Sequence, residues 1–250
     1  MSAVADIEME RHLAAAEPTL AASIVATLNR RARRVSLRID PALGAVVLVR
    51  PRGMSVKTAF AFVQSKRHWI ARRLADLPPR IVFDDGVTIP FQGRDHVIRH
   101  IKEGRGGVWR ENGVIYVSGR AEHIGRRVTD WLKAEAKRLL TPMVHVMAEV
   151  LGHKVARVSV RDTRSRWGSC SADGKLSFCW RLVLAPEAVL VYVAAHEVAH
   201  LRHLNHGRAF WKTLKEVLAT YAGGEHIMSA DAGSARQWLR RSGTALHSYG

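Results

Sequence analysis

Residues 193–206 read VAAHEVAHLRHLNH, and this stretch holds the most informative pattern in the chain. His196 and His200 are four positions apart, which in a helix places both imidazoles on one face, one turn apart. Two imidazoles at that spacing can bind one zinc ion between them. Glu197 lies beside this face, where its chemistry suits a general base toward a zinc-activated water rather than a ligand.

A solvated helix that happens to carry histidines is the alternative explanation for this string. The chain has 13 histidines, so pairs four positions apart arise easily. The neighbouring positions 193–195, 198, 199 and 201 are all apolar, however, and therefore predict a buried helix. A buried histidine pair with a glutamate needs partners. We therefore expect Zn²⁺ as the cofactor at this helix.

A catalytic zinc ion usually has three protein ligands and one open position. The nearby candidates for the third ligand are His203, His206, Glu225 and His226. His203 lies on the ligand face, but about 4.5 Å further along the helix axis than His200, at a rise of about 1.5 Å per residue. Asn205 and Gly207 favour a bend that returns the chain to the ion. We expect His206 to be the ligand, with an acidic or histidine ligand from positions 225–226 as the alternative.

A second motif, SRWGSC at residues 165–170, precedes this helix and is followed by WRL at 180–182 and LAP at 184–186. Together with HEVAHL at 196–201, NH at 205–206 and FW at 210–211, it resembles the YgjP-like and SprT-like zincin metallopeptidases. The YgjP-like branch is the better match. The SprT branch usually spaces its third histidine further away and often carries a Cys-rich ribbon, and this chain has only two cysteines.

The resemblance extends more loosely to RR at 33–34, VRP at 49–51, WI at 69–70 and Gly93, and so covers most of residues 23–215. It implies an α+β, zincin-like metallopeptidase domain with an active-site helix beside a small sheet. It also implies zinc ligands at His196, His200 and His206, with Glu197 as the general base. The residues alone indicate the same four positions, and the predicted activity is zinc-dependent hydrolysis of peptide bonds in a protein or peptide substrate.

The second motif also offers groups that could stabilise the transition state. Residues 175–180 predict a strand, and zincins generally pair one strand beside the active-site helix with the substrate backbone. If that strand is 175–180, Arg166 or Ser169 would lie near the cleft and could donate to the developing oxyanion. The alternative is structural: Trp167 fills the core, Gly168 makes a turn, and Arg166 pairs with a carboxylate.

Four other residues are expected to be structural. Cys170 and Cys179 match no zinc-binding spacing, so we interpret them as buried thiols. Phe210 and Trp211 are expected to pack the helix after the zinc loop against the core.

The predicted elements divide the chain into three parts. Residues 1–22 form a weakly ordered leader, residues 23–120 a β-rich region with one helix, and residues 121–250 the zincin-like catalytic domain. In the β-rich region, strands at 33–39 and 45–49 form a hairpin, and a helix capped by Ser55 runs to Leu77. In the catalytic domain, a helix covers 122–150 with a possible break at Pro142, and the zinc-binding helix runs from about 186 to 204.

The overall charge bears on partners and location. Lys and Arg number 39 against 22 Asp and Glu, which gives a formal net charge of +17. Such a chain attracts polyanions, so non-specific nucleic-acid contact and a protease acting on DNA-bound proteins are the second functional hypothesis. A non-catalytic, zinc-stabilised binding protein is the third, and Glu197 argues against it. Without a signal-peptide pattern or a long apolar run, we expect a cytoplasmic protein with no membrane contact. The oligomeric state has no signature in the sequence.

Overall fold

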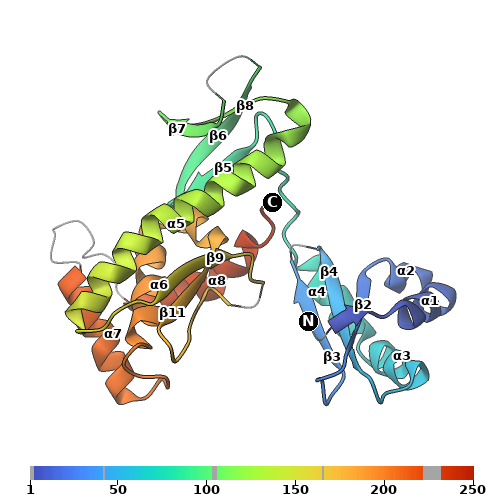
Figure 1. The fold of residues 1–250 in the computed structure, drawn as a ribbon. Coiled ribbons are helices and arrows are strands. Elements are labelled where there is room, and N and C mark those ends of the chain that lie inside the picture. The colour runs from blue at the N-terminus through green and yellow to red at the C-terminus, as the bar shows by residue number, and fades with distance from the viewer. Residues whose placement is uncertain (1–2, 42, 103–105, 165, 222–231) are drawn as a thin grey trace. The chain divides into compact units, whose positions relative to one another are not determined.

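The computed structural model describes residues 3–41, 43–102, 106–164, 166–221 and 232–250. These residues form two compact units, 1–80 and 81–250 (Figure 1). Both units combine helices with small sheets, which confirms the predicted α+β class. None of the helices in the described ranges combines the length and the apolarity needed to span a membrane.

The N-terminal unit is a four-stranded sheet with helices packed on it. The strands, in sheet order, are β1 (Ala3–Ala5), β2 (Ile24–Asn29), β4 (Ala45–Pro51) and β3 (Ser36–Asp40). The helices are α1 (Ile7–Ala16), α2 (Pro18–Ala21), α3 (Val56–Ser65) and α4 (Arg67–Ala75). The predicted hairpin is present as β3 and β4, which pair antiparallel. Ser55 caps α3 by accepting from the Thr58 amide, as expected, but the helix divides at Lys66 rather than continuing unbroken to Leu77.

The first residues are part of this unit, so the prediction of a weakly ordered leader at 1–22 is wrong for residues 3–22. Residues 1–2 lie outside the described residues. Met9 and Leu13 of α1 are fully buried in the same core as Ile24 and Leu48 of the sheet. The sequence concealed this because α1 contributes only two buried positions among alanines and charged residues, too few for a recognisable apolar stripe.

The second unit begins at residue 81, not at the predicted boundary of 120/121. Its first sheet has the order β5 (Thr88–Phe91), β6 (Arg94–Ile101), β8 (Val114–Ser118) and β7 (Val108–Glu111). Ile89, Ile98 and Ile115 of this sheet share one core with Val128 and Leu132 of the following helix. Strand patterns reveal which face is buried but not which element covers it, and for that reason the boundary was misplaced.

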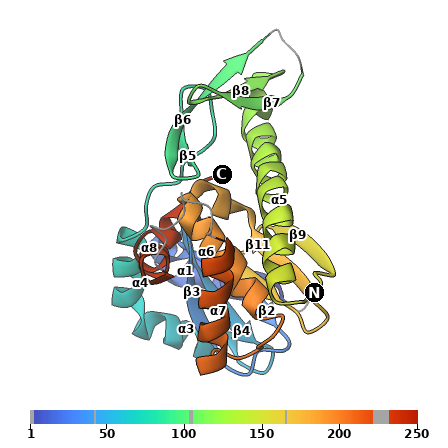
Figure 2. The ribbon, with the colours of Figure 1, turned by 90° about the vertical axis from the view of Figure 1, so that its left-hand side faces the viewer.

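The remaining elements of the second unit include one long helix, α5 (Ile124–Val150). The others are η1 (Ala121–His123), β9 (Arg157–Arg161), β10 (Gly168–Cys170), β11 (Lys175–Cys179), η2 (Trp180–Leu184), α6 (Glu187–Ala199), α7 (Arg208–Tyr221) and α8 (Ala232–Leu246). Pro142 lies inside α5 without interrupting it. The three strands form a second sheet in the order β10-β11-β9. Helix α6 contacts α5, α7, α8 and β10, so it lies at the centre of this half of the unit (Figure 2).

Candidate metal centre

Helix α6 carries the first two predicted ligands. It begins after Pro186 and is buried on nearly every side, from Val189 to Ala195 and again from Glu197 to Ala199. His196 and His200 are the partly exposed positions in its last turn and at its C-cap. The helix ends at Ala199, earlier than the predicted residue 204, so the chain turns immediately beyond the second histidine.

This early turn brings His206 back to the other two histidines. The Gly207 amide donates to the Asn205 side chain over 3.1 Å, which holds the bend that the sequence predicts at these positions. The Nε2 atoms of His206 and His196 are 3.0 Å apart. One ring nitrogen from each of His196, His200 and His206 lies within 4.8 Å of the others. In the described part of the chain, His203 is not in this group, and the alternative ligands Glu225 and His226 lie outside the described residues.

The contacts of the three imidazoles suit a divalent metal ion. The Nδ1 of His200 is 2.9 Å from the carbonyl oxygen of His203, so its Nδ1–H can donate there and leave Nε2 as the ligand atom. Burial and the neighbouring His200 and His206 lower the pKa of His196 to about 4, and burial also lowers the pKa of His206. Neutral imidazoles are the form that binds metal. A set of three nitrogens with no thiolate fits zinc better than a hard cation such as Mg²⁺.

Glu197 is buried beside this triad, with 6% of its surface exposed. Burial raises the pKa of its carboxyl to about 7, although the nearby Arg166 acts in the opposite direction. The side chain packs against Gly168 of β10 so closely that a Cβ added there would lie 2.5 Å from the Glu197 Cγ and Oε1. Gly168 therefore provides room for Glu197 within a strand, and the predicted turn at this glycine is wrong.

The second motif lies at this same edge. Arg166 is exposed and forms no ion pair with any carboxylate in the described ranges, so the structural alternative for this residue is not observed. Ser169 lies in β10 and lines a hollow together with Arg166. Ser165 lies outside the described residues.

The prediction that residues 175–180 pair with substrate backbone is wrong. Both edges of β11 (Lys175–Cys179) are occupied, by β10 on one side and β9 on the other. The edge strands of this sheet are β10 and β9, and β10 packs against α6. A strand of three residues has no recognisable alternation, so the sequence could not reveal it.

Comparison with known proteins gives a family match that includes the residues of this site. A family model described as the YgjP-like metallopeptidase domain matches residues 33–229. The chain belongs to the YgjP-like metallopeptidase family. A solved structure, the crystal structure of the metallopeptidase zymogen of Pyrococcus abyssi abylysin, is 19% identical, with 41% of this chain and 95% of that chain covered and a TM-score of 0.32. The search of curated proteins gives no match.

Aromatic residues form the surroundings of this YgjP-like site. Phe210 of α7 is fully buried, and its ring centroid lies 4.9, 4.7 and 4.7 Å from those of His196, His200 and His206. Its predicted packing role is confirmed, and the packing fixes the imidazoles themselves. Trp211 lies slightly further away, 5.9 Å from the His206 ring.

Trp167 and the two cysteines differ in how deeply they are buried. Trp167 stacks on His247 of the C-terminal segment at 4.7 Å and packs against the main core, as expected. Cys179 is fully buried as predicted, whereas Cys170 is only half-buried. Burial raises the pKa of Cys170 to about 11, with Glu197 contributing, so this thiol is a poor metal ligand at neutral pH.

Arg236 of α8 is a neighbour of the YgjP-like site that the sequence did not indicate. Its guanidinium lies 5.3 Å from the Trp211 ring centroid. Its charge also contributes to the lowered pKa values of His196 and His206. An isolated arginine 30 positions after His206 carries no local pattern, so only the packing of α8 against α6 reveals it.

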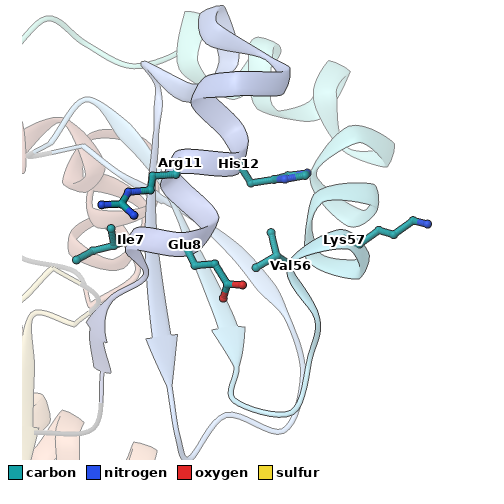
Figure 3. A pocket seen from close by; sticks show the side chains of 6 residues that line it. All are labelled: Ile7, Glu8, Arg11, His12, Val56 and Lys57. Carbon is teal, nitrogen blue, oxygen red and sulfur yellow. The ribbon is translucent and has the colours of Figure 1, made fainter.

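A larger hollow, of about 700 Å³, lies in the N-terminal unit and carries no such chemistry. It is lined by Ile7, Glu8, Arg11, His12, Val56 and Lys57. Figure 3 shows that these side chains diverge, with Lys57 and Arg11 extending away from each other. Because its polar groups do not converge on one point, the histidine triad is the stronger candidate for a functional site.

Proposed function

We propose that this chain is a zinc-dependent peptidase in which His196, His200 and His206 bind the metal and Glu197 is the general base. The observation that carries the proposal is the convergence of three imidazole nitrogens within 4.8 Å, next to a buried carboxyl group. Family membership supports metallopeptidase activity, and the donor set supports zinc as the metal.

The residues of the site have separate roles in the proposed hydrolysis. Bound zinc would lower the pKa of a water at its open position and polarise the scissile carbonyl. Glu197 then accepts a proton from the attacking water and donates it to the leaving amine. A pKa near 7 suits a group that must both accept and release a proton at neutral pH. The His203 carbonyl and the Phe210 ring keep the imidazoles oriented, and Arg166, exposed next to Glu197, is the candidate donor to the developing oxyanion.

The test combines metal analysis with peptidase assays on the full-length chain. We expect purified protein to contain zinc and to cleave members of a quenched fluorescent peptide library, and His206→Ala to lose both properties. His203→Ala is the matched control, because only its backbone carbonyl contacts His200 and alanine retains that carbonyl. Zinc retention by His206→Ala would refute the ligand set. Zinc binding without cleavage of any peptide would favour the non-catalytic, zinc-stabilised alternative.

A protease that acts on DNA-bound proteins is the second candidate function. The formal net charge is +17, and Arg30, Arg31, Arg33 and Arg34 are all exposed on the N-terminal unit. Contacts with phosphates weaken steeply as salt is raised. Binding to duplex DNA that persists at physiological salt and declines with added salt would support this candidate, and its absence would remove it.

A further inference from the structure

A hollow of about 370 Å³ lies on the outer face of the sheet formed by β9, β10 and β11. Ser159, Ser177 and Ser169 lie opposite one another across the three strands and form its floor. Three arginines form its rim: Arg157, Arg161 and Arg166. The other face of this sheet belongs to the main core, through Leu176 and Phe178. Short hydroxyl side chains below longer cationic ones create a polar recess.

The charges in this hollow are uncompensated. Its lining contains no carboxylate. The adjacent Lys175 is already paired with Asp173 at 2.5 Å, but the three rim arginines have no acidic partner in the part of the chain that the structure describes. The hydroxyls of Ser169 and Ser177 likewise have no hydrogen-bond partner there. Guanidinium and hydroxyl donors without acceptors favour an anionic ligand.

The hollow and the proposed catalytic base lie on opposite faces of strand β10. Strand β10 contributes to both places, because Gly168 packs against Glu197 and the next residue, Ser169, lines the hollow. Strand β10 is also one of the two edge strands of its sheet, where an extended peptide can add by backbone pairing. Successive side chains of such a peptide point to opposite faces. Alternate substrate residues would therefore face Ser169 and the rim arginines.

We propose that this hollow binds the carboxylate of an aspartate or glutamate in the peptide substrate, close to the bond that is cleaved. The inference rests on the peptidase function proposed above and adds a substrate class to it. A nucleic acid is the less favoured occupant, because strands are bound along grooves that follow several successive phosphates. Here the three arginines line the same hollow as the serines, and the hollow has room for a substrate side chain.

Paired substrates test this proposal. Quenched peptides that differ only by Glu or Gln at each position flanking the cleaved bond are compared by kcat/KM. At one position, we expect the full-length protein to prefer Glu by about tenfold, the gain typical of a hydrogen-bonded ion pair. Arg157→Gln combined with Arg161→Gln should reduce the Glu/Gln ratio to about one, since these guanidinium groups bind a carboxylate more strongly than a neutral amide. The control pair Arg126→Gln with Lys133→Gln makes the same charge change on α5 and should keep the preference.

Binding measurements separate this proposal from the proposed function. Fluorescence anisotropy with Glu197→Gln protein and the same labelled Glu and Gln peptides does not require cleavage. Tighter binding of the Glu peptide, lost in the arginine double variant, would support the hollow even if no peptide were hydrolysed. Equal binding and equal cleavage of both peptides would overturn the proposal. Duplex DNA that competes for the hollow and loses affinity in the same double variant would assign it to phosphate instead.

Discussion

Asp6 of the N-terminal unit and Glu197 of the second unit are both buried carboxylates, and their surroundings are opposite. Asp6 in the N-terminal unit is 3% exposed and accepts from Arg50 at 2.5 and 2.8 Å. Glu197 in the second unit is 6% exposed and has no ion pair among the described residues. Arg50 holds the pKa of Asp6 below its usual value, whereas burial raises the pKa of Glu197 to about 7.

The difference shows how burial can serve either stability or reactivity. A buried carboxylate with a well-placed guanidinium keeps its charge and holds distant segments together. A buried carboxylate without such a partner favours its protonated form and is poised to exchange a proton near neutral pH. Exposure alone cannot distinguish the two residues. The presence or absence of a guanidinium partner does distinguish them.

The largest effect is expected from Glu197→Gln. Glutamine retains the size of the side chain but cannot accept a proton, so we expect kcat/KM to fall by about a thousandfold or more. Zinc content should stay unchanged, because residue 197 lies outside the ligand group of the three histidines. Inductively coupled plasma mass spectrometry and the peptide assay measure the two properties separately. Unchanged activity would eliminate Glu197 as the base.

The equivalent change in the other unit, Asp6→Asn, should affect stability and not zinc binding. It leaves Arg50 buried without its strongest partner, and breaking a buried ion pair costs about 3 kcal/mol or more. Hydrogen exchange measured by mass spectrometry should show lost protection in peptides from β2 and β4. Glu8→Gln is the control, since the Glu8 side chain is 75% exposed and its contact with Arg50 is worth at most about 1 kcal/mol. Equal effects of the two variants would mean that the buried Asp6–Arg50 pair stabilises the unit no more than the exposed Glu8–Arg50 contact does.

The pH dependence of stability should have opposite signs for the two carboxylates in zinc-free protein. The folded pKa of Asp6 is lowered, so its stabilisation is present above the unfolded pKa of about 4 and is lost as the pH falls through the folded value. The folded pKa of Glu197 is raised, so wild-type protein loses stability as the pH rises from about 4.5 through about 7.

Chemical denaturation from pH 3 to pH 8 measures these opposite trends. Glu197→Gln should match the wild type near pH 4 and exceed its unfolding free energy by up to about 3 kcal/mol at pH 8, because glutamine carries no charge to bury. Asp6→Asn should approach the wild type only at the acidic end. Parallel curves for the two variants would contradict the contrast between a paired and an unpaired carboxylate.

The comparison also separates what the sequence could predict from what it could not. His196, Glu197 and His200 share one helical turn, so local spacing alone places them together. The bend at Asn205 and Gly207 brings His206 close to the two other histidines. Local patterns failed wherever the partner is distant. Asp6 and Arg50 are 44 positions apart, and no pattern in residues 1–22 predicts that pair.

The misplaced elements have the same physical cause. The strands of residues 88–118 were recognisable, but the core that they share with α5 depends on tertiary packing, and the domain boundary was therefore placed at 120 instead of 80. The edge strand β10 is three residues long, so it became visible only through its contact with α6. Arg236 reaches the site from α8 in the same way.

The close contact between Gly168 and Glu197 is expected to determine where the Glu197 carboxyl group lies. Gly168→Ala places a methyl group about where the Glu197 carboxyl lies, so the base must shift. A misplacement of about 1 Å typically costs about a hundredfold in rate, and we expect kcat/KM to fall by about that factor while zinc content is retained. Gly53→Ala is the matched control, because a Cβ there meets nothing within 4 Å. Full activity of Gly168→Ala would show that Glu197 can shift without loss of activity and that its contact with β10 does not determine its position.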